Sequence, residues 1–223
     1  MNKVCQPEKY KLVYEGGSGE IIEKKSRFIA TVKPVTSESE AYAFIESVKK
    51  KYWDARHNCH AFVIGMHQEI TRCSDDGEPA GTAGKPMLDV LLGQNLHNTA
   101  VVVTRYFGGT LLGTGGLVRA YSKAVSEGLL ESTIIEKIPG CRIQVTTDYT
   151  GIGKIQYIAA AMSLPILDCQ YTDIVVMHVL TDFDSKNAFI KKVTEATSGS
   201  AILEELGNCY FAEVNGSTMI FDS

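Results

Sequence analysis

The chain lacks the long apolar segments that mark secreted and membrane proteins. Residues 1–19 contain no continuous apolar core of the kind that a signal peptide needs. The most apolar stretch, Ile155 to Leu167, is too short to span a bilayer and is interrupted by Pro165. We therefore expect a cytoplasmic protein with no membrane partner.

Closely spaced cysteine pairs are also missing. In a chain with no secretory signal, scattered cysteines without a C-x-x-C motif are typical of reduced thiols that pack as small hydrophobes. The sequence therefore predicts free thiols and no metal centre. The six cysteines are Cys5, Cys59, Cys73, Cys141, Cys169 and Cys209.

The chain has no excess of positive charge. Its net charge is −4, and the charge is shared unevenly between the two halves. Residues 1–139 carry 17 lysines and arginines against 16 acidic residues, whereas residues 140–223 carry 5 against 10. This balance argues against a protein that grips nucleic acid through bulk charge, so any such contact must be local.

Standard nucleotide-binding motifs are absent. A P-loop requires G-x-x-x-x-G-K-[ST], but Pro79 stands where the first glycine belongs and Pro86 follows Gly84-Lys85. A Rossmann fingerprint fails because Val118 replaces the third glycine after Gly113-Thr114-Gly115. We expect no nucleotide bound by a standard route and no other cofactor.

The first half combines strand and helix patterns. Ser37-Glu38-Ser39-Glu40 has the form of a capping box and predicts a helix that begins at Ser37. A buried strand is expected at 100–103 and a long amphipathic helix at 117–129. Further strands are expected at 21–24, 28–32, 58–65 and 69–74, and a short helix from Pro86.

Pro139-Gly140 predicts a domain boundary. Beyond it the expected order is strand, helix, strand, strand, helix, strand, which is the split β-α-β unit of a ferredoxin-like domain. The sequence thus predicts an α+β protein with domains at 1–138 and 139–213 and a tail at 214–223. The expected elements are strands at 142–146, 166–171, 174–180 and 201–208, and helices at 152–162 and 184–197.

The most informative segment runs from Arg105 to Arg119 and contains five glycines between a buried strand and a helix. Glycines there let a ligand approach the backbone, and the free N–H groups of a helix N-terminus favour an anion. A plainer interpretation is that they only allow a tight strand-to-helix connection. The binding hypothesis assigns to an anion or nucleic-acid site Lys85, Arg105, Tyr106, Phe107, Gly108, Gly109, Gly113, Thr114, Gly115, Gly116 and Arg119.

Two polar segments offer alternative chemistry. Asp75, Asp76 and Glu78 place three carboxylates in a short loop, which suits Mg²⁺ binding or acid–base work, although a solvated loop is the commoner outcome. His57 and His60 flank Cys59, and alternation along a strand puts the two histidines on opposite faces. Cys59 or Cys73 as a nucleophile has no supporting local signature, so no catalytic residue is assigned.

Several separated segments together resemble the IMPACT/YigZ family over about residues 18–130. The segments that carry the resemblance are Arg56–Ala61, Ser74–Pro79, Gly81–Pro86, Arg105–Gly109 and Leu112–Tyr121. The acidic second half is similar to the C-terminal domain of bacterial members. The resemblance implies a ribosomal-protein-type β-α fold like domain IV of elongation factor G, followed by a domain similar to that factor's domain V.

The resemblance also implies a link to translation. Eukaryotic members regulate translation through an additional N-terminal RWD domain that competes with a kinase for its activator, and no such domain is expected here. Bacterial members have no established reaction, which argues against an enzyme.

Three functions remain open. The first is a non-catalytic protein that binds RNA, the ribosome or a translation factor through the glycine-rich segment, helped by Lys24, Lys25 and Arg27. The second is an enzyme that acts on a small phosphorylated or carboxylated substrate between the acidic and glycine-rich loops. The third is an interaction module whose acidic second domain docks a basic partner.

Overall fold

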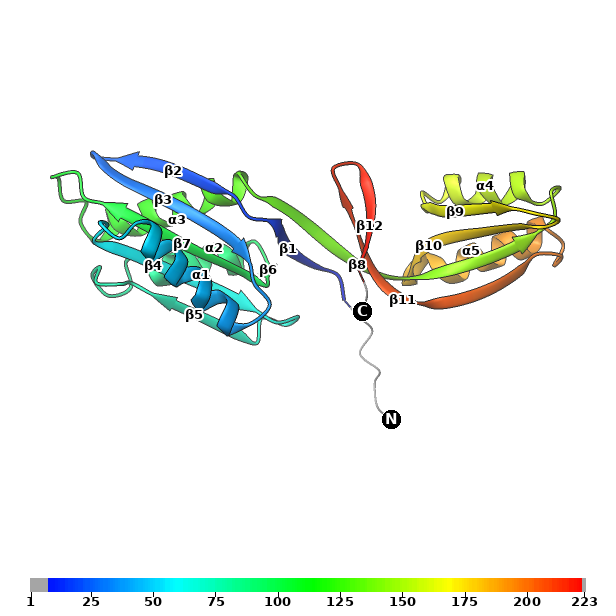
Figure 1. Ribbon diagram of the computed structural model, residues 1–223, viewed down its shortest axis with the longest axis horizontal. Coiled ribbons are helices and arrows are strands. Elements are labelled where there is room, and N and C mark those ends of the chain that lie inside the picture. Colours follow the sequence, from blue (N-terminus) through cyan, green and yellow to red (C-terminus); the bar gives the residue numbers. More distant parts are fainter. Residues whose placement is uncertain (1–7, 222–223) are drawn as a thin grey trace. The chain divides into compact units, whose positions relative to one another are not determined.

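The computed structural model describes residues 8–221, and the chain divides into two compact units (Figure 1). The first unit comprises Tyr10–Glu136 and the second begins at Lys137. The change from one unit to the other falls inside a single strand, β8 (Thr133–Thr147). It therefore lies close to Pro139-Gly140, but no loop separates the units there.

The first unit is built on a five-stranded sheet in which every neighbouring pair is antiparallel. The middle strand, β7, is buried along its whole length except at its last residue, which agrees with the apolar run expected at 100–103. In sheet order the strands are β2 (Ser18–Glu23), β3 (Ser26–Pro34), β7 (Thr99–Tyr106), β4 (His57–Ile64) and β5 (Ile70–Ser74).

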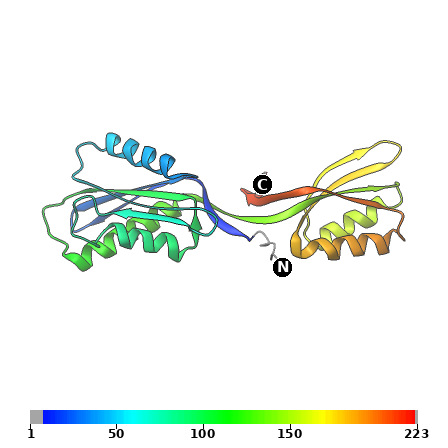
Figure 2. The ribbon, with the colours of Figure 1, turned by 90° about the horizontal axis from the view of Figure 1, so that it is seen from below.

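Helices cover both faces of this sheet (Figure 2). α1 (Glu38–Lys51) packs on one face, where Phe44 and Ile45 meet Phe62 of β4. α2 (Gly84–Gly93) and α3 (Thr114–Leu130) pack on the other face. Fully burying each large apolar side chain contributes about 1.5–3 kcal/mol, so the two packed layers fix the sheet and its strand ends.

The N-terminus of α1 follows the expected signal with one difference. The Ser37 side chain accepts a hydrogen bond from the Glu40 amide at 3.2 Å, as a capping box requires. The Glu40 carboxylate reaches one residue further back than expected, to the amide of Thr36 at 2.7 Å. The serine cap is therefore confirmed, but the Glu40 carboxylate accepts from the amide of Thr36 and not from that of Ser37.

The second unit has the predicted β-α-β-β-α-β order. Its four main strands form an antiparallel sheet in the order β11-β8-β10-β9, and both helices cover the same face (Figure 2). Phe189 and Val193 of one helix pack with Ile155 of the other. After β8 the elements are α4 (Ile152–Ala161), β9 (Ile166–Tyr171), β10 (Val175–Asp182), α5 (Phe183–Ala196) and β11 (Ile202–Val214).

The residues from 214 onward are not a tail, contrary to the sequence expectation. β12 (Ser217–Phe221) pairs with β11 in an antiparallel hairpin. The two-residue loop is Asn215-Gly216, and both residues have positive φ (50° and 77°). Asn-Gly is the strongest short hairpin signal, so the sequence does contain an indication of this strand. Residues 222–223 of the expected tail lie outside the described residues.

Two strands were not predicted from the sequence. β1 (Tyr10–Glu15) and β6 (Leu96–His97) pair in parallel. A strand of two residues is too short to show any periodicity, because alternation needs four or more positions.

The five cysteines in the part of the chain that the structure covers each lie in a strand. Cys59, Cys73, Cys141 and Cys169 are free thiols, and Cys59, Cys141 and Cys209 are buried as expected, whereas Cys73 is exposed. Cys5 lies outside the described residues. No helix among those described is long and apolar enough to cross a membrane.

Candidate functional site

The glycine-rich segment leaves the first sheet at one end, where several other segments also meet. β7 ends at Tyr106, which lies opposite Arg27 at the start of β3. Arg105 lies opposite His57 at the start of β4. The segment after β7, the β2–β3 turn and the residues that follow α1 are therefore gathered at the same end of the sheet (Figure 1).

Arg105 faces the interior rather than a ligand, which corrects the expectation from sequence. Its side chain is 7% exposed and its Nη1 donates a hydrogen bond to Glu78 Oε1 at 2.6 Å, where the carboxylate is 4% exposed. The guanidinium also lies 5.3 Å from the centre of the Phe28 ring. A buried charge needs such a partner, so Arg105 supports the fold and does not serve a surface anion site.

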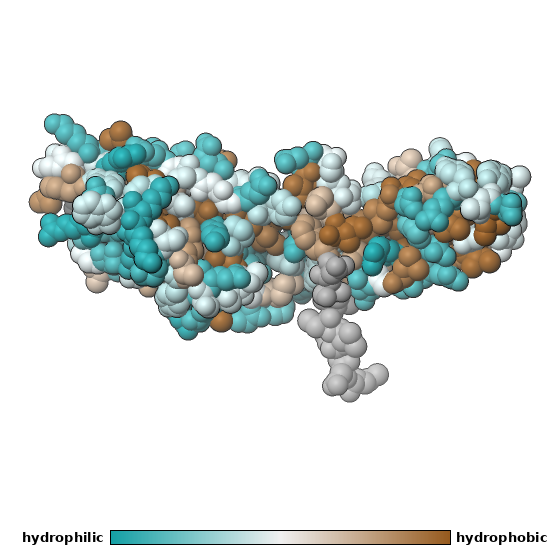
Figure 3. Space-filling view, in the orientation of Figure 1, coloured by the Kyte–Doolittle hydropathy of each residue, from teal (hydrophilic) through white to brown (hydrophobic). Residues whose placement is uncertain are grey.

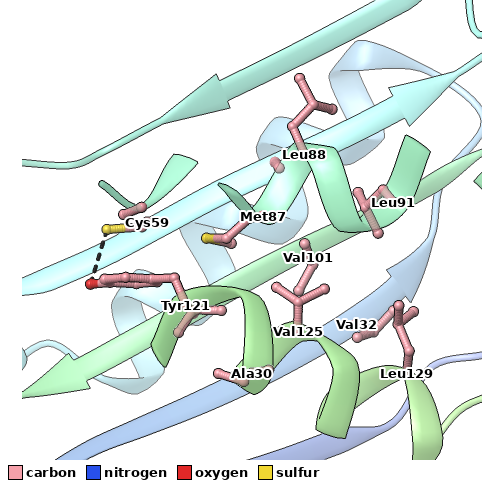
Figure 4. Close-up of a cluster of buried hydrophobic side chains, with 14 of the residues drawn as sticks. Ala30, Val32, Cys59, Met87, Leu88, Leu91, Val101, Tyr121, Val125 and Leu129 are labelled. Atoms are coloured by element: carbon pink, nitrogen blue, oxygen red, sulfur yellow. Dashed lines mark hydrogen bonds between the residues drawn. The ribbon is translucent and has the colours of Figure 1, made fainter. Parts of the chain in front are cut away.

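Glu78 extends this ion pair into a buried polar chain. The Tyr121 hydroxyl donates to Glu78 Oε1 at 2.9 Å, and the Cys59 thiol donates to the Tyr121 oxygen at 3.3 Å (Figure 4). Burial raises the pKa of the Cys59 thiol to about 12. Since the thiolate is the reactive form, Cys59 is unsuited to act as a nucleophile, and Glu78 Oε1 accepts hydrogen bonds from two buried side chains.

Asp75 organises the loop before α2. Its carboxylate accepts hydrogen bonds from the amides of Gly81, Ala83 and Gly84 at 2.8–2.9 Å. Burial alone would raise the pKa of this carboxyl, but these three amides outweigh burial and hold the pKa below its ordinary value. Asp75 therefore satisfies free N–H groups at the start of α2, which a helix N-terminus needs.

Asp76 and His57 tie the same loop to the sheet. The Asp76 carboxylate accepts from the Asn58 amide at 2.7 Å and lies 3.5 Å from the Lys49 ammonium. His57 Nδ1 lies 2.9 Å from the Asp76 carbonyl oxygen. Burial, followed by the nearby Lys49, lowers the pKa of His60.

The polar cluster expected from sequence is thus brought together, but its carboxylates accept hydrogen bonds from groups of the protein itself. No group of three histidine, cysteine, aspartate or glutamate side chains suited to a metal ion occurs among the described residues. The arrangement stabilises the loop between β5 and α2.

The glycines of the glycine-rich segment differ in whether packing or backbone conformation requires a glycine at that position. A Cβ at Gly108 would clash with the backbone of Lys25, so packing requires this glycine. Gly113 has φ of 72°, which favours glycine on conformational grounds. A Cβ at Gly115 would meet only the Arg119 Nη1 atom at 3.6 Å. Neither packing nor dihedral angle requires glycine at 115, so the exposed backbone there is free for a ligand to approach.

The first turn of α3 lacks a capping side chain. Gly113 is the N-cap residue and offers none, and no acidic residue lies in the first turn. The amides of Thr114, Gly115 and Gly116 are therefore not capped by a side chain of the described residues. Thr114 and Gly115 are exposed, so this helix end presents partial positive charge to solvent.

A small cavity beside this helix end collects cationic side chains. It measures about 230 Å³, and Lys24, Arg119 and Lys123 line it together with one carboxylate, Glu23. All three cations are exposed, and no ion pair to them is present among the described residues. Lys123 comes from the third turn of α3 and was not selected from sequence, although it follows Arg119 at i+4 on the same helix face.

The β2–β3 turn adds backbone strain to this cationic surface. Glu23 pairs with Ser26, so Lys24 and Lys25 alone form the loop, with φ of 46° and 69°. A two-residue loop with two positive φ values prefers Asn-Gly, because side chains with a Cβ are disfavoured there. Two lysines at these positions keep positive charge at a cost in stability, and backbone strain of this kind concentrates at functional sites.

The remaining residues that the sequence assigned to the anion site lie in different environments. Phe107 is 55% exposed and Gly109 is exposed. The Tyr106 hydroxyl donates to Asp54 at 2.8 Å, which anchors the chain after α1 to the end of β7. Lys85 pairs with Asp89 at 2.6 Å within α2 itself, and it does not line the cavity beside α3.

Two domain-family models match the sequence. The model described as "Impact N-terminal domain" covers residues 24–129, and "Domain of unknown function (DUF1949)" covers residues 145–200. These matches lie in the first and second structural units respectively.

Bacterial proteins are similar over most of the chain. "IMPACT family member YvyE" of Bacillus subtilis is 43% identical and the alignment covers 88% of this chain and 90% of that protein. "IMPACT family member YigZ" of Escherichia coli is 38% identical, with 79% and 88% covered. A solved structure of a hypothetical protein, 35% identical, covers 90% of this chain and 98% of that one with a TM-score of 0.56.

Proposed function

This chain belongs to the IMPACT family, and from that premise we propose that it is a non-catalytic, translation-linked protein that binds RNA or the ribosome through one end of its first unit. The proposed surface, which we call the cationic end, comprises the amides of residues 114–116, the β2–β3 turn and the exposed cations Lys24, Lys25, Arg119 and Lys123. The link to translation comes from the family resemblance.

The observation that carries the proposal is the coincidence of unpaired cations with an uncapped helix N-terminus. Arg119 and Lys123 lie beside the cavity next to the exposed Gly115 backbone. Phosphate groups are bound by such combinations of backbone N–H groups and basic side chains. This local charge suits a chain whose total charge is negative, because only the contact surface must be positive.

The enzyme hypothesis is less well supported by the same geometry. Its acid–base or metal-binding groups were Asp75, Asp76 and Glu78. Asp75 accepts from three amides, Asp76 from the Asn58 amide, and Glu78 from a buried arginine and a buried tyrosine. These carboxylates stabilise the loop and the core, so they are poorly placed to receive a substrate proton.

The test is binding by the full-length chain after charge reversal. We expect co-sedimentation with ribosomes or a shift of RNA in a gel, and we expect Arg119→Glu with Lys123→Glu to abolish it. Lys191→Glu with Lys192→Glu, on exposed positions near the end of α5, is the matched control and is expected to bind normally. Binding that survives the first pair, or its absence in the native protein at low salt, would rule out the proposal.

A further inference from the structure

A large aromatic side chain at the same end of the first sheet as the cationic end has no structural partner. Trp53, the single tryptophan of the chain, is 83% exposed. It follows Tyr52, the residue that ends α1, and none of the aromatic contacts in the described residues includes it. Leaving an indole this exposed forgoes the roughly 1.5–3 kcal/mol that burying a large apolar side chain contributes, so packing does not explain its position.

The backbone that carries Trp53 is nevertheless held in place. The Ala55 amide donates to the Tyr52 carbonyl at 3.0 Å and closes a turn. The Asp54 carboxylate accepts from the Tyr106 hydroxyl at 2.8 Å, which fastens this turn to the end of β7. The indole is therefore displayed from an ordered turn, at the strand end from which the glycine-rich segment departs.

The neighbours of Trp53 are cations without carboxylate partners. Lys50, Lys51 and Arg56 are exposed, and no ion pair to any of them is found within the described part of the chain. Lysines in the last turn of a helix also complement its dipole, but that role does not call for an exposed indole. Hydrophilic side chains with isolated hydrophobic ones between them cover this end of the unit (Figure 3).

A second exposed ring lies on the same end. Phe107 directly follows β7 and is 55% exposed, and the Arg105 guanidinium lies 5.6 Å from its ring centre. Exposed aromatic rings among unpaired cations are the combination that single-stranded nucleic acids require, since the rings stack on bases and the cations follow the phosphates.

We propose that the cationic end, together with the turn after α1 and Phe107 at the same end of the sheet, binds single-stranded in preference to duplex RNA, with the Trp53 and Phe107 rings stacking on unpaired bases. This inference rests on the proposed function and specifies its ligand. In a duplex each base is already stacked between neighbours, and A-form RNA offers mainly phosphates and 2′-hydroxyl groups to a protein. An exposed indole gains a stacking partner only from unpaired bases, and it accepts any base because each has a π face.

The test uses Trp53 as its own fluorescent reporter in the full-length protein. Three probes are titrated at low salt: a single-stranded oligouridylate, a blunt RNA duplex of the same length, and inorganic polyphosphate as a charge-only control. We expect quenching of Trp53 by the oligouridylate and little quenching by the duplex or polyphosphate at equal occupancy.

Variants of Trp53 test whether its ring contributes to the affinity or only lies near the bound RNA. Trp53→Ala is expected to weaken oligouridylate binding roughly 5- to 100-fold with little effect on the duplex, whereas Trp53→Phe retains most of the affinity. Tyr157→Ala removes a 75% exposed ring from α4 and is the matched control with no expected effect.

The outcomes distinguish this inference from the proposed function. Equal quenching by all three probes, or unchanged affinity of Trp53→Ala for oligouridylate, would overturn the stacking proposal. If RNA binds and depends on Arg119 but not on Trp53, the proposed function stands and the indole belongs to a different partner. If neither RNA probe binds even at low salt, the stacking proposal fails, and ribosome co-sedimentation alone then decides the proposed function.

Discussion

A buried guanidinium needs a carboxylate partner, and Glu78 fills that role for Arg105. We expect Glu78→Ala to lower the free energy of unfolding by about 3–5 kcal/mol, because it strands a buried cation and leaves the Tyr121 hydroxyl without its acceptor. Urea unfolding of the full-length chain measures this cost. Glu20→Ala breaks the exposed pair with Arg27, at 39% and 51% exposure, and is expected to cost at most about 1 kcal/mol. Similar costs for the two variants would contradict the assignment of Arg105 to the core.

The carboxylate of Asp75 makes a pH-dependent contribution. Its pKa in the folded protein lies below the ordinary value of 3.8, so the unfolded chain takes up the proton at higher pH. The stability that Asp75 provides is therefore present above about pH 4 and is lost as pH falls through the folded pKa.

We expect Asp75→Asn to reduce the free energy of unfolding by about 1 kcal/mol at pH 7, as removal of a helix cap does. The difference from the native chain is expected to shrink below about pH 4, and urea unfolding at several pH values measures it. Asp173→Asn, on the exposed turn before β10, controls for the removed charge. A difference that stays constant down to about pH 2 would contradict the role given to Asp75.

Residue types in the sequence did not indicate the partners of each side chain. Arg105 and Arg119 look alike in the sequence, as basic groups flanking the same glycines. Only the packing of Phe28 and Glu78 around the end of β7 shows that one is internal. Trp53 was missed because one aromatic residue after a helix carries no pattern, and its exposure is decided by tertiary packing.

At the scale of elements, the β2–β3 turn has a backbone conformation that favours Asn-Gly, yet its two residues are lysines. Replacing Lys24-Lys25 by Asn-Gly relieves two positive φ values, and we expect the free energy of unfolding to rise by about 1–2 kcal/mol. The same change removes two cations, so RNA affinity is expected to fall. Thermal or urea unfolding and RNA titration measure the two effects.

The matched control keeps the strain and the charge. Lys24→Arg with Lys25→Arg is expected to change neither stability nor affinity. If the Asn-Gly variant is no more stable than the native chain, the turn is not strained. If its RNA affinity is unchanged, the turn is not part of the cationic end.

Element types were predictable wherever the periodicity was long. The helix expected from Ser37 and the helix expected at 117–129 are present as Glu38–Lys51 and Thr114–Leu130, and the β-α-β-β-α-β order of the second unit is present as predicted. β6 could not be found because it has two residues. The change between units at Glu136–Lys137 lies close to Pro139-Gly140, but β8 continues through it and no linker marks it.

At the scale of the whole molecule, charge is divided between the units. The acidic excess lies in residues 140–223, with 10 acidic against 5 basic residues. The proposed RNA contact lies entirely in the first unit. A chain with net negative charge offers phosphates no general attraction, so RNA binding should depend on few cations and respond strongly to the removal of each.

The central claim is that Arg119 and Lys123 meet phosphate groups at the cationic end. Its most direct test is the salt dependence of binding to single-stranded RNA, measured by fluorescence anisotropy for the native chain and for Arg119→Ala with Lys123→Ala. We predict that the slope of log affinity against log salt becomes shallower by about 1.4, roughly 0.7 for each phosphate that is no longer neutralised. Lys191→Ala with Lys192→Ala should leave the slope unchanged. An identical slope for the native chain and the Arg119/Lys123 variant would contradict the claim.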